Sequence, residues 1–332
     1  MHSINRRFAL RLGVGLTAAL SGGLLMCHAA QGAEWPSKPL RLIVNFPPGG
    51  AVDAIGRTIG QPLSATLAQP VLVENKAGAG GAIGADFVAK AAPDGYTLLI
   101  SAGTFLTIGP HVYSKLPLDP LKDLVPVAAV SRGIQYLLVR ADLPVKDGSD
   151  FLLYLQKNSP KMSYGSAGSG TGPHLAGEMF KARTNTQAAH IPYKGAAPAL
   201  QDLLAGRLDY MFDPGVGLAQ LPGGKVRLLA IGGPKRVARF PEIPTLEELG
   251  VRNFDAESIF GVYAPAKTPQ EIVNKLNTEI NKQLLTESVR NAITSNGAEV
   301  ADPLTPDAFA RALRQESDRF GSIARERNIR AD

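Results

Sequence analysis

Covalent chemistry has few candidate side chains in this sequence. Ser166 or Ser169, together with His174 and Asp213, is the one set that could supply a nucleophile, a base and an orienting carboxylate. Neither serine lies in the Gly-x-Ser-x-Gly turn that exposes a hydrolase nucleophile, and the order of the set matches no hydrolase motif. We therefore predict no catalytic residues, and a hydrolase acting on a small carboxylate-bearing substrate is the alternative hypothesis.

Metal and cofactor sites are not predicted either. Beyond the N-terminal segment the histidines are His111, His174 and His190, and they lack paired spacing of the His-Glu-x-x-His kind. Gly78 to Gly84 has the glycine density of a dinucleotide-binding turn. However, Ile83 stands in place of its third glycine, and no acidic residue follows about twenty positions later. We interpret this segment as a helix entry that packs closely on a sheet.

Two glycine-rich segments are suited to anion binding. Phe46 to Gly50 follows an apolar run, Gly165 to Gly172 follows another, and each leads directly into a helical pattern. Glycine lets backbone amides approach a ligand, and a helix N-terminus adds unpaired N–H groups with a partial positive charge. Either segment alone could be a simple tight turn. Together they predict a shared cleft in which neutral donors hold a carboxylate.

The apolar runs and the helical spacing around these segments predict alternating strands and helices that position them. A first helix is predicted from the spacing of Val52, Ile55, Ile59, Leu63 and Leu67, with a kink at Pro62. This alternation favours an α/β architecture with parallel sheets. The apolar runs predicted as buried strands are Leu40 to Phe46, Val71 to Val73, Tyr96 to Ile100, Gln135 to Val139, Ala188 to Ile191 and Val226 to Ile231.

Three later helices are predicted from capping residues. Thr245 with Glu248 and Thr268 with Glu271 have the spacing of capping boxes, and Thr305 before a proline opens a final helix. The apolar side of the final helix comprises Phe309, Leu313, Phe320 and Ile323.

The N-terminal segment has the layout of a secretory signal peptide. Arg6, Arg7 and Arg11 precede an uncharged stretch, Leu12 to Met26, that is too short to span a membrane. We expect removal of residues 1–33, ordinary secretion and a periplasmic location; the twin-arginine route, suggested by Arg6 and Arg7, is an alternative. The single cysteine, Cys27, lies inside this segment, so the mature chain would have no disulfide; a lipid anchor at Cys27 is an alternative.

Size and charge limit the remaining function classes. About 300 residues would remain after cleavage, which suits two lobes better than one core. The net charge of +6 would fall by three, to +3, because the signal has three arginines and no acidic residue. Charges of both signs are mixed along the chain without a basic stripe, so nucleic-acid binding is not expected. A cytoplasmic ligand-sensing regulator is also disfavoured, because the signal occupies the place of a DNA-binding unit.

Ten short motifs, in the same order along the chain, make the sequence resemble the Bug receptors, the TctC-type periplasmic binding proteins of tripartite tricarboxylate transporters. The resemblance spans the mature chain. Its motifs are Trp35 to Pro39, Phe46 to Gly50 with Asp53, Val73 to Lys76, Gly78 to Gly81, Pro93 to Leu99, Tyr164 to Gly168, His174 to Glu178, Pro192 to Gly195, Asp209 to Asp213 and Phe240 to Thr245.

This resemblance implies an α/β, two-lobe type II periplasmic-binding-protein fold with the ligand cleft between the lobes. We expect crossovers near Gln135 and Ser258, with one lobe from residues 34–134 and 259–332 and the other from 135–258. It further implies a small organic acid as ligand, a membrane permease as partner, no enzymatic activity and no cofactor. We expect a monomer whose lobes close around the ligand.

The resemblance also carries candidate ligand-binding residues to this chain. Asp53 is expected mainly to brace its loop, and Lys194 has the alternative of a solvated surface lysine. The candidates from the first lobe are Phe46, Pro48, Gly49, Gly50, Asp53, Ser101 and Thr104. Those from the second lobe are Ser166, Ser169, Gly170, Thr171, His174, Lys194, Gly195 and Asp213.

This sequence departs from the family pattern at Val52, at Phe105 and at Asp213 to Gly215, where the usual Asp-Asn pair is missing. These changes make the pocket less polar and favour a more apolar or aromatic acid.

Overall fold

A computed structural model describes residues 35–326 and 328–331. The predicted signal peptide, residues 1–33, and its Cys27 lie outside the described residues. The chain divides into two compact units, Met1–Ser37 and Lys38–Asp332, and both sheets belong to the second.

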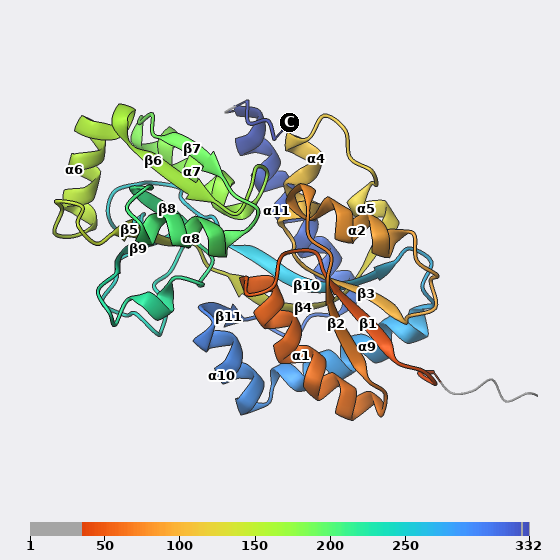
Figure 1. The fold of residues 1–332 in the computed structure, drawn as a ribbon. Coiled ribbons are helices and arrows are strands. Elements are labelled where there is room, and N and C mark those ends of the chain that lie inside the picture. The colour runs from red at the N-terminus through yellow and green to blue at the C-terminus, as the bar shows by residue number, and fades with distance from the viewer. Residues whose placement is uncertain (1–34, 327, 332) are drawn as a thin grey trace, which may run out of the picture. The chain divides into compact units, whose positions relative to one another are not determined.

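The first sheet has six strands in the order β11-β4-β10-β3-β1-β2 (Figure 1). β1 runs parallel to β2 and β3, whereas β10 runs antiparallel to β3 and β4, and β11 runs antiparallel to β4. Its strands are β1 (Leu40–Val44), β2 (Val71–Asn75), β3 (Thr97–Ala102), β4 (Leu124–Gly133), β10 (Ser258–Pro265) and β11 (Ala298–Val300).

The second sheet has five strands in the order β7-β6-β8-β5-β9. β6 is parallel to β7 and β8, and β5 is antiparallel to β8 and β9. Its strands are β5 (Tyr136–Arg140), β6 (Ser163–Ser166), β7 (Ala189–Pro192), β8 (Tyr210–Asp213) and β9 (Val226–Ile231). The prediction of parallel sheets is therefore confirmed for β1 with β2 and β3 and for β6 with β7 and β8, and it is wrong for the antiparallel pairs, because an apolar run indicates burial of a strand and not its direction.

The helices cover both sheets. α1 continues unbroken through Pro62, and the five apolar residues that predicted it are all buried. The helices are α1 (Ala51–Leu67), α2 (Ala82–Ala89), α3 (Thr104–Thr107), α4 (Gly109–Val112), α5 (Pro120–Asp123), α6 (Gly148–Asn158), α7 (Gly172–Thr184), α8 (Ala196–Leu204), α9 (Gln270–Leu284), α10 (Glu287–Ser295) and α11 (Pro306–Glu326).

Only part of the capping prediction is confirmed. Thr305 Oγ1 accepts a hydrogen bond from the amide of Ala308 at the start of α11. α9 forms as predicted, but the Thr268 hydroxyl donates to the carbonyl of Pro265 instead of capping it. Thr245 and Glu248 make the reciprocal hydrogen bonds of a capping box, yet a turn follows and not a helix. Here the backbone is engaged in a bridge between Thr245 and β9, which competes with helix formation.

The glycine-rich segment before α2 is the close helix entry that we expected. A Cβ atom on Gly81 would lie 2.5 Å from Asn45 Nδ2, and one on Gly84 would lie 2.7 Å from the carbonyl oxygen of Lys76. Glycine at these positions therefore serves the packing of α2 against the end of β1.

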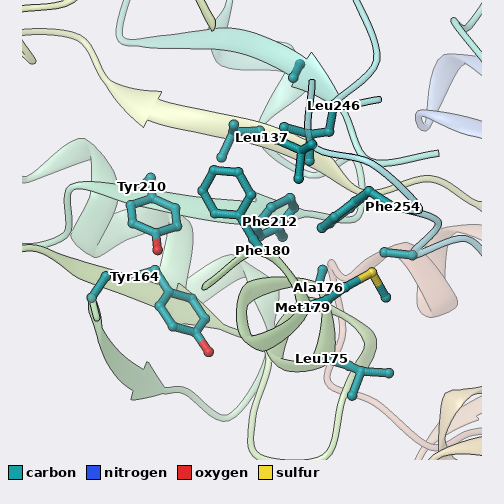
Figure 2. Packing of buried hydrophobic residues seen from close by; sticks show 14 of the residues in the cluster. Leu137, Tyr164, Leu175, Ala176, Met179, Phe180, Tyr210, Phe212, Leu246 and Phe254 are labelled. Carbon is teal, nitrogen blue, oxygen red and sulfur yellow. The ribbon is translucent and has the colours of Figure 1, made fainter. Parts of the chain in front are cut away.

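Aromatic rings dominate the core beside the second sheet. Figure 2 shows Phe180 of α7, Phe212 of β8 and Phe254 packed together, with ring centroids 5.5 Å apart for the first two and 5.7 Å apart for the last two. α11 contributes to two cores: Phe309 and Leu313 pack beside the first sheet, whereas Phe320 and Ile323 belong to the cluster of Phe180. One helix thus connects the hydrophobic cores of both sheets.

A buried carboxyl group attaches α11 to the elements that border the cleft described below. Glu316 Oε1 accepts from the Thr107 hydroxyl at 2.9 Å, and Oε2 accepts from the Ile259 amide at 2.9 Å. Burial raises the pKa of Glu316 to about 7, although both hydrogen bonds act to lower it. α11 is thereby fixed to α3 and to the start of β10.

We predict that Glu316→Gln changes how stability depends on pH. Because folding raises the pKa of Glu316, its protonated carboxyl group stabilises the folded state fully below the unfolded pKa of about 4.5. This stabilisation is lost as pH rises through the folded pKa of about 7. The variant should therefore gain stability relative to wild type between pH 5 and pH 8, by an amount on the order of 2 kcal/mol. Urea unfolding at both pH values measures this difference, with the exposed Glu242→Gln as control. An identical pH dependence in wild type and variant would contradict the assignment.

Candidate ligand-binding cleft

A cleft of about 600 Å³, including its mouth, is lined by residues that follow strands of both sheets. None of the described residues that line it is Asp, Glu, Lys, Arg or His. Apolar side chains such as Val52, Pro173 and Phe260 provide most of its wall. Of the sequence-predicted candidates, those that line the cleft are Phe46, Pro48, Gly50, Thr104, Thr171 and Gly195.

Three helices begin at the cleft. Gly50 precedes α1, Thr171 precedes α7 and Gly195 precedes α8, and each of these residues lines the cleft. The first amides of a helix have no partner within it and carry the positive end of the helix dipole. The cleft wall therefore attracts anions without a cationic side chain.

Asp53 and Gly49 lie beside the cleft and shape the loop before α1. Asp53 Oδ2 accepts from the amide of Gly49 at 3.0 Å, and Oδ1 accepts from Asn75 Nδ2 at 2.9 Å. Arg57 pairs with the same carboxylate. Burial acts to raise the pKa of Asp53, but the hydrogen bonds from Arg57, Gly49 and Asn75 outweigh it and lower the value. Gly49 has a φ of 78°, a conformation that favours glycine.

Ser101 and Asp213 are buried and face protein groups. The Ser101 hydroxyl accepts a hydrogen bond from Asn45 Nδ2 at 3.1 Å. Asp213 Oδ2 accepts from the amides of Gly215 and Gly217, both at 2.9 Å, while burial raises its pKa to about 7. Asp213 thereby shapes the turn that carries Pro214, and Pro214 lines the cleft.

His174 and Ser166 contribute to a stack of rings behind the second glycine-rich loop. His174 Nδ1 accepts from the amide of Gly170 at 3.1 Å, and its ring stacks on His190 with centroids 4.0 Å apart. His190 Nε2 and Ser166 Oγ share a hydrogen bond of 2.6 Å. Burial, with help from His174 and Lys181, lowers the pKa of His190 to about 3, so this ring is neutral near pH 7. His174, His190 and Ser166 thus pack against the loop Gly165 to Gly172, and His174 holds its backbone at Gly170.

The side chains of the alternative hydrolase hypothesis do not assemble into a catalytic set among the described residues. Ser166 pairs with His190 and not with His174, and the Asp213 carboxylate binds backbone amides. Ser169 contributes its carbonyl oxygen, which accepts from the Tyr113 hydroxyl at 2.8 Å. Lys194 is exposed and lies at a neighbouring depression with Tyr193.

Gln135 and Ser258 line the cleft but were not predicted to bind ligand. We expected the two crossovers near these residues but assigned no role to their side chains. Their position in the sequence could have indicated a contact with the ligand, because a residue at a crossover lies between the two sheets and therefore beside the cleft.

No group of three or more His, Cys, Asp or Glu residues among the described residues could hold a metal ion. Among the same residues, no helix is long and apolar enough to cross a membrane.

Comparison with known proteins identifies the family. Residues 55–329 match the family model described as "Tripartite tricarboxylate transporter family receptor". The chain belongs to this receptor family. The family membership that its motifs predicted is thereby confirmed.

The receptor is similar to proteins of known sequence and structure. It is 38% identical over 296 residues to BugT of Bordetella pertussis, covering 88% of this chain and 90% of that protein. It matches the structure "R. palustris Rpa4515 with adipate" with a TM-score of 0.86 and 33% identity, covering 90% of this chain and 99% of the other. It matches MatC of Rhodopseudomonas palustris with bound malate with a TM-score of 0.82 and 32% identity, covering 87% and 99%. The two-lobe periplasmic-binding-protein fold is confirmed by the match to the structure of the periplasmic binding protein BugD, with a TM-score of 0.83 and 32% identity, covering 89% of this chain and 99% of the other.

Removing the Asp53 carboxylate should destabilise this receptor. In Asp53→Ala the amide of Gly49 and the side chains of Asn75 and Arg57 lose their common partner. The loss of charge-assisted hydrogen bonds to a largely buried group should lower the free energy of unfolding by about 2 kcal/mol.

Denaturant unfolding at pH 7 measures the Asp53→Ala effect. The control is Asp142→Ala, whose exposed carboxylate pairs with Arg140 and should contribute less to stability because solvent screens the pair. Equal stability of the two variants would show that Asp53 does not support its loop.

Proposed function

We propose that this receptor captures a small organic carboxylate outside the cytoplasm and delivers it to the membrane permease of a tripartite tricarboxylate-type transporter. The observation that carries the proposal is an uncharged cleft bordered by the N-termini of α1, α7 and α8. Amides at helix starts stabilise an anion, and the apolar wall contacts its carbon skeleton.

The relatives support the carboxylate class. Rpa4515 is described with adipate and MatC with bound malate, and both molecules are small organic acids. Export into the periplasm is supported by the signal-peptide pattern of residues 1–33 and by the family. A receptor role without catalysis agrees with the partners of Ser166, His174 and Asp213, which are structural.

We assign the ligand contacts to two groups of candidates. Phe46, Pro48, Gly50, Thr104, Thr171 and Gly195 would contact the acid directly, because they line the cleft. The remaining candidates would act by holding the loops, as Asp53 does for Gly49 and His174 does for Gly170.

In this proposal the first lobe comprises residues 34–134 and 259–332, and the second lobe comprises residues 135–258. The chain crosses between the lobes near Gln135 and near Ser258. Contacts across the cleft include the hydrogen bond from Tyr113 to Ser169. We expect these contacts to open without ligand by rotation of whole lobes. Small-angle scattering should therefore show a smaller radius of gyration at saturating ligand. An unchanged radius would indicate a rigid pocket.

The direct test of the proposed function is identification of the acid. Mass spectrometry of the gently purified protein, followed by thermal shifts with organic acids and their methyl esters, would reveal it. A ligand at about 100 times its dissociation constant stabilises the folded state by about 2.7 kcal/mol. Stabilisation by neutral sugars or cations and by no carboxylate would exclude the proposal.

A charge placed on the cleft wall should discriminate against acids. Ala197 lines the cleft in the first turn of α8, where an aspartate is compatible with the helix. Repulsion between two like charges about 5 Å apart is worth about 3 kcal/mol at an effective dielectric constant near 20. Ala197→Asp should therefore weaken acid binding by about a hundredfold more than the neutral, equally sized Ala197→Asn. Calorimetry measures both variants, and equal affinities would place the carboxylate elsewhere.

A further inference from the structure

Two polar side chains at the crossovers are buried in the cleft wall without a partner. Gln135 is 2% exposed and Ser258 is 1% exposed, and both line the cleft. Among the described residues, neither Gln135 Oε1 nor Ser258 Oγ has a hydrogen-bond partner. A buried oxygen that lacks a partner is unfavourable, so a ligand group that pairs with both oxygens gains affinity.

The backbone holds these two side chains in the same region. The amide of Gly232 donates to the carbonyl of Gln135 at 2.6 Å, and the carbonyl of Gly232 accepts from the amide of Ala256 at 3.0 Å. Ser258 is also in register with Gly133, two residues before Gln135. The two crossover segments are therefore fixed to each other through Gly232 and through the pairing of β4 with β10.

The Gln135 side chain extends toward the start of α7. A Cβ atom on Gly172 would lie 3.3 Å from Gln135 Nε2 and 3.2 Å from Thr104 Cγ2. The amide group of Gln135 is thus close to one of the helix N-termini assigned to the carboxylate. A ligand seated there would have its carbon skeleton within reach of the crossovers.

We propose that Gln135 and Ser258 form a subsite for a neutral hydroxyl group, and that the acid carried by this receptor is a hydroxy acid. This inference rests on the proposed function. A hydroxyl can donate to Gln135 Oε1 while it accepts from the Ser258 hydroxyl. A second carboxylate lacks a proton to donate to Gln135 Oε1, so it would place a negative charge against that oxygen instead of a hydrogen bond. An unsubstituted acid leaves both oxygens unpaired.

The test uses matched acids. Calorimetry would compare hexanoate with 2-hydroxyhexanoate, 6-hydroxyhexanoate and adipate, and benzoate with 4-hydroxybenzoate. In at least one series the hydroxy acid should bind about tenfold more tightly than its parent, and adipate should bind no more tightly than hexanoate. Ser258→Ala and Gln135→Met should each reduce the preference for the hydroxy acid over its parent acid.

Ser131→Ala is the matched control. Ser131 Oγ is likewise buried without a partner among the described residues, but Ser131 does not line the cleft, so this variant should retain the preference. Ser258→Ala should also melt at the wild-type temperature without ligand, because its hydroxyl has no described internal partner to lose.

The outcomes separate the two proposals. Binding of the acids without preference for a hydroxyl, or a preference that survives both cleft variants, would overturn the subsite and leave the carboxylate function standing. Failure of all six acids to bind would overturn the carboxylate function and the subsite together.

Discussion

The cleft depends on the hydrogen bonds that Gly232 makes to both crossover segments. Its amide and carbonyl connect Gln135 to Ala256, so the two chain segments that pass between the sheets are held together. A Cβ atom at Gly232 would lie 2.8 Å from the carbonyl oxygen of Gln135, closer than a side chain tolerates. This close approach fixes the segment that leads into β10, whose Ser258 and Phe260 line the cleft.

The cleft combines a favourable potential for anions with a wall free of charged side chains in the described part of the chain. Partial charges at helix starts are fixed by the backbone, whereas a lysine or arginine would need ordering on each binding event. Two carboxylates beside this region accept hydrogen bonds from backbone amides: Asp53 Oδ2 from Gly49, and Asp213 Oδ2 from Gly215 and Gly217. These acidic residues thereby shape the loops that bring Gly50 and Pro214 to the cleft.

α11 adds a second physical link between the two halves of the receptor. Its first turns bury Phe309 in the core of the first sheet, and its later turns bury Phe320 in the core of the second. Glu316 lies between them and fixes the helix to α3 and β10. The proposed lobe rotation would therefore act on this helix as well as on the two crossovers.

The sequence by itself determined the receptor family, six of the strands, α1 and the glycine-rich loops that lead into α1 and α7. These features depend on local patterns: apolar periodicity reports burial, and glycine next to a helix start reports close backbone approach. Only the tertiary structure decided the direction of β10 and β5, the turn at Thr245 and the location of each polar candidate. The reason is that a polar side chain acquires its role from neighbours distant in sequence. Ser166 pairs with His190 and Asp213 with the amides of its own turn, whereas Gln135 and Ser258 reach the cleft because β4 pairs with β10.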